Sequence, residues 1–210
     1  MIITYLIIGV TVLISLSAFN NPDIIHKFKH WPYGEARRGE YFRWLTGGFL
    51  HGDYMHLFFN MITLYFFGRS VEMWFGVLFP ELGQTLFLVF YLISIVAASL
   101  ATFYKYKDAP HFASIGASGA VSAVLFAAIL LQPTLSLYLM FIPIPIPGFI
   151  YAVFYLWYSS QAANRGGDGI DHLAHFYGAV FGFLFPLVLK PMLFASFITQ
   201  LSEWFASWGS

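Results

Sequence analysis

The chain of 210 residues contains no cysteine and few charged side chains. The lack of cysteine excludes disulfides, thiolate nucleophiles and thiolate metal ligands. Only 10% of the residues are charged, whereas a soluble domain carries about 25%, and the formal net charge is zero. Without an overall charge bias, binding to nucleic acid would need a local basic patch, and the sequence shows none. We therefore expect no nucleic-acid partner.

Apolar and aromatic residues are abundant instead. Hydrophobic residues make up 59% of the chain and aromatic residues 21%, and the mean hydropathy is +0.72. A bilayer core about 30 Å thick is crossed by about 20 apolar helical residues, and aromatic rings gather at its interfaces. The composition therefore predicts an integral, multi-pass membrane protein in contact with a lipid bilayer.

Six apolar segments are candidates for membrane crossings, namely residues 2–19, 54–78, 84–104, 112–132, 147–161 and 170–189. The first lacks the cationic start of a secretory signal, so we interpret it as a retained anchor. Pro143, Pro145 and Pro147 cannot sit inside a regular helix, so the fifth crossing begins late and is short. The predicted fold is all-α, a six-transmembrane-helix bundle.

Three of the stretches outside these crossings have a distinct composition. Residues 20–48 form a long basic connection, which we expect to be functional or to have structure of its own. Residues 164–169, which include Gly166, are typical of a flexible turn. After Pro191, apolar residues at helical spacing predict an amphipathic helix on the membrane surface. They are Phe194, Phe197, Ile198, Leu201, Trp204, Phe205 and Trp208. We predict a membrane domain over residues 1–190 and an interfacial tail over residues 191–210.

Polar residues in the second, fourth and sixth segments converge on one membrane face. These segments run in the same direction, so their N-terminal ends lie together. His56 and Asn60 fall in the first two turns of the second segment, Ser118 about six residues into the fourth and His175 about five into the sixth. At 1.5 Å per residue, Ser118 and His175 would lie on the order of 7–9 Å below the face. Ionisable side chains at membrane depth indicate function by default.

Small residues favour contact between the fourth and sixth segments. His175, Gly178 and Gly182 lie on one face of the sixth, and Gly116 and Gly119 lie in the fourth. Small residues spaced four apart let membrane helices approach closely, which would bring imidazole and hydroxyl within reach. A serine next to a base is a nucleophile for acyl transfer, and its oxyanion needs preorganised donors. The candidate donors are the backbone N–H of Ser118 and the side chains of Asn60 and His56.

These residues resemble those of the rhomboid intramembrane serine proteases over about residues 40–185. The matching elements are Gly116-Ala117-Ser118-Gly119, His56 with Asn60, His175 with Gly178 and Gly182, Arg43-Trp44-Leu45-Thr46 ahead of His51, and Gly68 with Glu72. The ordered combination is far more specific than any one element.

The resemblance implies a six-helix bundle with a water-filled cavity, which cleaves single-span, membrane-anchored substrates near the outer face without a cofactor. Ser118 would be the nucleophile and His175 the general base, with His56 and Asn60 binding the oxyanion. Arg43, Glu72 and the glycines would be supporting architecture. We expect a prokaryotic inner membrane, and substrate access between the second and fifth segments.

The sequence departs from the family pattern at two points. Many relatives carry an aromatic residue four positions after the nucleophile that stacks on the histidine, whereas this chain has Ser122, which Tyr177 does not obviously replace. The family orientation, which we keep, leaves eight of the ten basic residues outside, although positive charge favours cytoplasmic loops. The eight are Lys27, Lys29, Arg37, Arg38, Arg43, Lys105, Lys107 and Arg165.

Other interpretations stay open at this point. The chain could be a non-catalytic, rhomboid-like protein that binds membrane clients, although such relatives usually lose the serine or the histidine. It could hold a metal or haem through histidines, of which His51, His56, His172 and His175 are the candidates. We interpret His51 and His172 as structural. A transporter is disfavoured, because paired repeats and charged midplane residues are not evident.

Overall fold

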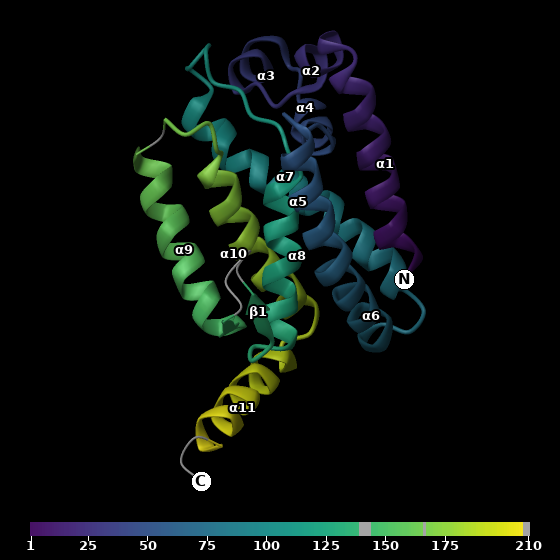
Figure 1. Ribbon diagram of the computed structural model, residues 1–210, viewed down its shortest axis with the longest axis vertical. Helices are drawn as coiled ribbons and strands as arrows, with labels where there is room; N and C mark the ends of the chain where they lie inside the picture. Colours follow the sequence, from purple (N-terminus) through teal and green to yellow (C-terminus); the bar gives the residue numbers. More distant parts are fainter. Residues whose placement is uncertain (139–143, 166, 208–210) are drawn as a thin grey trace.

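The computed structural model describes residues 1–138, 144–165 and 167–207 and is almost entirely helical (Figure 1). Pro143, Gly166 and Trp208, which the sequence predictions name, lie outside the described residues. The long helices are α1 (Ile2–Phe19), α7 (Gly83–Tyr106), α8 (Ser118–Leu131), α9 (Gly148–Arg165), α10 (His172–Leu189) and α11 (Met192–Ala206). The predicted all-α class is confirmed.

The connection after α1 has structure of its own, as predicted. It contains α2 (Pro22–Phe28), α3 (Pro32–Arg38), α4 (Arg43–Thr46) and the 3₁₀ turn η1 (Gly47–Phe49). Proline stands at the start of α2 and α3, where a missing N–H costs nothing. Gly39 ends α3 with a φ of 71°, which glycine adopts without strain. These short helices gather at one end of the bundle (Figure 1).

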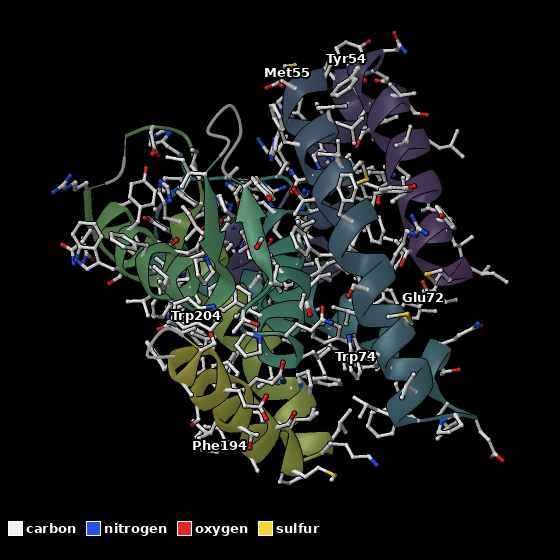
Figure 2. The ribbon with its side chains drawn as sticks, turned by 60° about the horizontal axis from the view of Figure 1, so that its bottom comes forward. Tyr54, Met55, Glu72, Trp74, Phe194 and Trp204 are labelled. Atoms are coloured by element: carbon white, nitrogen blue, oxygen red, sulfur yellow. The ribbon has the colours of Figure 1, made fainter. Side chains whose placement is uncertain are left out.

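The second segment is one continuous helical rod with the predicted bounds. It consists of α5 (Tyr54–Thr63), the π-helical turn η2 (Leu64–Gly68) and α6 (Arg69–Leu78). The side chain of Asp53 accepts a hydrogen bond from the backbone N–H of His56 at 2.8 Å, which caps α5. In Figure 2, Tyr54 and Met55 lie at one end of this rod and Glu72 near the other.

The fourth segment begins later than predicted. The sequence predicts a helix from residue 112, but α8 begins at Ser118. Gly116 has a φ of 132°, which no right-handed helix contains, and Ser114 forms a β-bridge with His30. Ser118 is therefore the first residue of its helix rather than about the sixth. The argument from helical rise does not apply to it, because the chain reaches Ser118 through a non-helical segment.

The fifth segment also differs from its prediction. An antiparallel pair of short strands, β1 (Ser136–Tyr138) and β2 (Pro145–Pro147), precedes it, and the sequence analysis does not anticipate these strands. The proline prediction is correct in that α9 begins only at Gly148. The helix continues to Arg165, however, and with 18 residues it is longer than expected.

Helix α8 is the core of the molecule. Every residue from Gly119 to Leu131 is buried, and α10 packs against it along the predicted glycine stripe. A Cβ on Gly178 would lie 2.1 Å from the backbone oxygen of Gly119, and one on Gly182 would lie 2.0 Å from that of Ala123. Only glycine permits this separation of the two backbones, so the predicted close approach is confirmed.

Apolar side chains also cover much of the outside of the bundle, as expected of a membrane protein. Among the described residues, α1, α7 and α10 are long and apolar enough to cross a bilayer, and α8 is a shorter apolar helix. The count of six crossings and the division at residue 190 stay predictions. The C-terminal helix α11 exists as expected, with Phe194 and Trp204 at different points along it (Figure 2). Its place on a membrane surface stays a prediction.

Candidate active site

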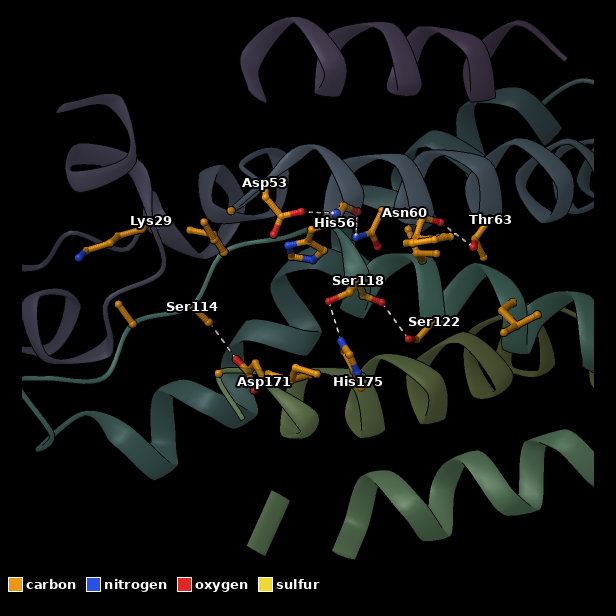
Figure 3. A pocket seen from close by; sticks show the side chains of 18 of the residues that line it. Lys29, Asp53, His56, Asn60, Thr63, Ser114, Ser118, Ser122, Asp171 and His175 are labelled. Atoms are coloured by element: carbon orange, nitrogen blue, oxygen red, sulfur yellow. Dashed lines mark hydrogen bonds between the residues drawn. The ribbon is translucent and has the colours of Figure 1, made fainter. Parts of the chain in front are cut away.

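The N-terminal ends of α8 and α10 bring Ser118 and His175 together. The Nε2 atom of His175 lies 2.7 Å from Oγ of Ser118, a hydrogen-bond distance between residues 57 positions apart (Figure 3). The two helices and α5 start at the same end of the bundle, where α2 to α4 also lie (Figure 1). A base within 3 Å of a hydroxyl can accept its proton, which is the requirement for a serine nucleophile.

Gly116 determines how Ser118 is presented. Its positive φ turns the chain into α8, so the backbone N–H groups of Ser118, Gly119 and Ala120 belong to the first turn and lack helical acceptors. A Cβ on Gly116 would also lie 2.8 Å from the ring of His56, so the glycine leaves the space that this ring occupies. The start of α8 therefore directs backbone donors and its helix dipole at the same region as the hydroxyl.

Asp171 fixes the start of α10, and with it His175. Its Oδ1 accepts hydrogen bonds from the backbone N–H of Ala174 and from the hydroxyl of Thr102, at 3.0 and 2.9 Å. Its Oδ2 accepts a hydrogen bond from the hydroxyl of Ser114 at 2.9 Å (Figure 3). One carboxylate thus ties α10 to α7 and to the segment that leads into Ser118. Each additional fixed partner narrows the positions that the serine and the histidine can take relative to each other.

His56 and Asn60 lie on the face of α5 that looks toward Ser118 (Figure 3). The side-chain amide of Asn60 donates a hydrogen bond to the backbone oxygen of His56 at 2.9 Å. An amide nitrogen carries two hydrogens, so one donor of Asn60 is left after this bond. Both side chains line the cavity that also contains Ser118 and His175.

This cavity has a volume of about 760 Å³. Besides the four predicted site residues, Lys29, Asp53, Ser122, Tyr155 and Asp171 are part of its lining. Asp53 and Gly52 are exposed, so the cavity reaches the surface of the molecule. A volume of this size holds several water molecules or a short length of extended peptide.

Arg43 and Glu72 lie outside the cavity and make dense hydrogen bonds. Arg43 is buried, bonds to Glu40 at 2.7 Å and donates to the backbone oxygens of His26 and Lys29 at 3.1 and 3.2 Å. Glu72 accepts hydrogen bonds from the backbone N–H groups of Ile3 and Thr4 and from the Thr4 hydroxyl. A carboxylate on the first N–H groups of α1 satisfies the helix end and its dipole.

The two other candidate histidines, His51 and His172, have hydrogen-bond partners other than Ser118. His51 is fully buried, and its Nδ1 lies 2.9 Å from the Ser15 hydroxyl. Loss of solvent on burial, with the neighbouring His56 second, lowers the pKa of His51 from 6.5 to about 3. His172 is paired with Asp168 at 2.7 Å. In the described part of the chain, no three His, Asp or Glu side chains come together in a way that could hold a metal ion.

Sequence reasoning missed two contributors to this site. Asp171 directly precedes the sixth segment, and an acidic residue before an apolar run is a known capping signal that could have been used. Tyr155 gave no usable signal, because one tyrosine among 13 tyrosines and 25 phenylalanines is not distinguished from aromatic residues that face lipid.

The fold and the site together define a helical membrane protein with a serine–histidine pair in a cavity that reaches the surface. The family model described as the rhomboid domain matches residues 38–192. The chain therefore belongs to the rhomboid family, which confirms the resemblance drawn from its motifs.

Three curated relatives have similar sequences. RHOMBOID-like protein 12, mitochondrial, of Arabidopsis thaliana is 36% identical over 147 residues, which cover 64% of this chain and 42% of that protein. Rhomboid protein 1, mitochondrial, of Saccharomyces cerevisiae is 31% identical over 148 residues, which cover 67% and 40%. Rhomboid protease GlpG of an Enterobacter species is 30% identical over 96 residues, which cover 45% and 30%. The matched regions span less than half the length of each relative.

Proposed function

We propose that this protein is an intramembrane serine protease in which Ser118 is the nucleophile and His175 the general base. The observation that supports this most is the 2.7 Å separation of Ser118 Oγ and His175 Nε2 inside a cavity that reaches the surface. A relative named as a protease, at 30% identity over 96 residues, supports the same assignment.

The proposed reaction follows acyl transfer. Nε2 of His175 accepts the Ser118 proton while Oγ attacks the scissile carbonyl carbon, and the carbonyl oxygen becomes an oxyanion. His56, the free donor of Asn60 and the backbone N–H of Ser118 would stabilise that charge. The imidazolium then protonates the leaving amine. His175 then accepts a proton from a water molecule, which attacks the acyl carbon. As the bond between that carbon and Ser118 Oγ breaks, His175 gives the proton to Oγ, and the carboxylic acid product leaves.

The proposed substrates are single-span membrane proteins cut near the outer face. A peptide in helical hydrogen bonding does not present its carbonyl to a nucleophile, so a good substrate unwinds easily and carries a small residue at the cut. We propose access between α5 and α9, which both line the cavity, α5 through Asn60 and α9 through Tyr155. Cross-links between a bound substrate and α1 or α7, rather than α5 or α9, would contradict this route of access.

We propose an inner membrane as the location. The sequence expectation is a prokaryotic inner membrane, whereas two of the relatives carry the word mitochondrial in their names. Fractionation of the source cells tests this, and recovery of the protein in any other membrane contradicts it.

The central experiment is cleavage of a model single-span substrate by the purified protein in detergent. Wild type should cleave it, and Ser118→Ala and His175→Ala should not. Equal cleavage by all three would exclude the pair. Substrate binding by wild type without cleavage would favour the client-binding alternative, and stoichiometric zinc, iron or haem in the purified protein would favour the metal alternative.

A further inference from the structure

We propose that Tyr155 of α9 is a positioning residue for His175 and that Ser122 holds it in place. The proposal rests on the proposed function and concerns the same site. The family pattern has an aromatic residue at the position of Ser122 that stacks on the histidine. In this chain another residue must therefore orient the imidazole of His175.

His175 has little to hold its ring besides Ser118. Among the described residues, Ser118 is the one hydrogen-bond partner of its ring nitrogens. The nearby carboxylate of Asp171 is engaged with Thr102, Ser114 and the Ala174 backbone. No carboxylate in the described structure therefore orients the imidazole as the third member of a triad would.

Two aromatic contacts flank the imidazole instead. The ring of Tyr155 is stacked on His175 at an interplanar angle of 25°, with 6.4 Å between the ring centroids. The ring of His172 meets His175 edge-on, at 83° and 5.8 Å. These centroid distances are within the range at which aromatic pairs have a preferred geometry. Tyr155 therefore limits rotation of the imidazole about its χ angles on one side.

The hydroxyl of Tyr155 connects the same side chain to the nucleophile. It lies 2.5 Å from the hydroxyl of Ser122, and Ser122 donates a hydrogen bond to the backbone oxygen of Ser118 at 2.8 Å. A serine hydroxyl has one hydrogen and a carbonyl can only accept. Since the Ser122 hydrogen points to Ser118, Tyr155 is the donor to Ser122. One side chain thus contacts the base with its ring and reaches the serine backbone through its hydroxyl.

The surroundings of Tyr155 are built to hold the ring. Phe126 of α8 and Tyr151 of α9 flank it, with ring centroids 5.5 and 5.6 Å away. The small side chain at Ser122 leaves room for a ring that enters from α9. An aromatic residue at position 122 would occupy the place where the Tyr155 hydroxyl now bonds.

The test compares the side chain's ring and its hydroxyl separately. Tyr155→Leu removes the ring and Tyr155→Phe removes the hydroxyl. Phe154→Leu removes a neighbouring ring that is 65% exposed and is not part of the cavity lining. The measurements are kcat and KM for the model substrate, and the rate at which a fluorophosphonate labels Ser118. The label needs the activated serine but no membrane-spanning substrate, so it separates positioning from substrate access.

We expect Tyr155→Leu to lower kcat and the labelling rate together, by about 10- to 100-fold, with KM unchanged, because a misplaced base costs rate rather than binding. Tyr155→Phe should lower both rates by a smaller factor than Tyr155→Leu, Ser122→Ala should lower them by the same factor as Tyr155→Phe, and Phe154→Leu should match wild type. A Tyr155→Phe variant and a Ser122→Ala variant that both match wild type would overturn the role of Ser122. In a Ser122→Ala background, Tyr155→Phe should have no further effect, since the hydroxyl has already lost its partner.

The outcomes distinguish this proposal from the protease proposal. An active wild type with a Tyr155→Leu variant that labels at the wild-type rate would overturn the role of Tyr155 and leave the Ser118–His175 pair intact. A change in KM alone would also overturn it, because it would assign Tyr155 to substrate access. If wild type neither cleaves nor labels, the protease proposal and this one both fall. Thermal unfolding identifies a misfolded variant, in which case Tyr155→Met, which keeps apolar volume without a ring, replaces Tyr155→Leu.

Discussion

Asn60 uses one amide hydrogen within α5 and has a second one available at the cavity. A side chain with one hydrogen in a fixed bond and one hydrogen free can serve as a preorganised donor. The bond to the backbone of His56 fixes the side-chain rotamer, and the free hydrogen can then meet a charge that exists only in the transition state. Thr63 lies one turn further along and also lines the cavity, but its hydroxyl donates within the helix to Phe59.

We therefore expect Asn60→Ala to lower kcat about 100-fold, the usual effect of losing one oxyanion donor, with little change in KM. Thr63→Ala is the matched control and should keep wild-type turnover. Steady-state cleavage of the model substrate measures both. Equal kcat values for Asn60→Ala and wild type would remove Asn60 from the proposed oxyanion site.

His51 predicts a pH dependence of stability. Burial lowers its pKa from 6.5 to about 3, so below pH 6.5 the unfolded chain binds a proton that the folded chain does not. The stabilising contribution of neutral His51 is fully present above pH 6.5 and is lost as the pH falls toward 3. Thermal unfolding midpoints of wild type should fall more over this range than those of His51→Gln. Parallel pH curves for the two proteins would contradict the assignment.

The contact between α8 and α10 determines the site at the scale of secondary-structure elements. Ser118 and His175 meet because two backbones approach at Gly119 with Gly178 and at Ala123 with Gly182. A change in the distance between α8 and α10 would therefore also change the distance between Ser118 Oγ and His175 Nε2. By contrast, Gly76 in α6 has open space where a Cβ would be.

Gly178→Ala should push α10 away from α8, lower the free energy of unfolding by about 1–3 kcal/mol and abolish most of the cleavage. Gly76→Ala should be neutral or slightly stabilising, because alanine favours a helix where space allows. Thermal unfolding and cleavage of the two variants, measured side by side, test this. A Gly178→Ala protein as stable and active as wild type would mean that the contact of Gly178 with Gly119 does not determine the distance between α8 and α10.

The sequence predicts elements well where local patterns determine them. Hydropathy alone predicts α1 and the rod formed by α5, η2 and α6 with the observed bounds. It fails at the start of α8, because the apolar residues before Ser118 are kept out of a helix by Gly116 and by pairing with distant His30. The pairing of Ser118 with His175 was predictable from spaced small residues. The role assigned to Tyr155 was not, since it depends on how α9 rotates toward α8.

At the scale of the whole molecule, one end of the bundle carries the cavity and the helices α2 to α4, and the turn between α6 and α7 lies at the other (Figure 1). The family orientation, which we propose here, puts the cavity end outside. Eight of the ten basic residues then lie outside, so the preference of positive charge for cytoplasmic loops favours the reverse orientation.

The absence of cysteine makes this orientation directly measurable. A single cysteine at exposed Lys107 should react with a membrane-impermeant maleimide added to intact cells, and one at exposed Glu81 should react only after lysis. The two variants are matched controls for each other. The opposite pattern would mean that the cavity faces the cytoplasm and that charge, not the family pattern, sets the topology.

The burial of α8 on every side has a consequence for how the surrounding lipid affects turnover. The serine is carried by a helix whose residues beyond the first are all buried in the protein or at its cavity, whereas α9 exposes Val153, Phe154 and Trp157 to the surroundings of the protein. A change in acyl-chain length or bilayer thickness would therefore act on the position of α9. Through the ring of Tyr155 it would then affect the position of His175 relative to Ser118. Turnover in thin and thick bilayers should differ more in wild type than in Tyr155→Leu, which would make this protein responsive to the membrane that contains it.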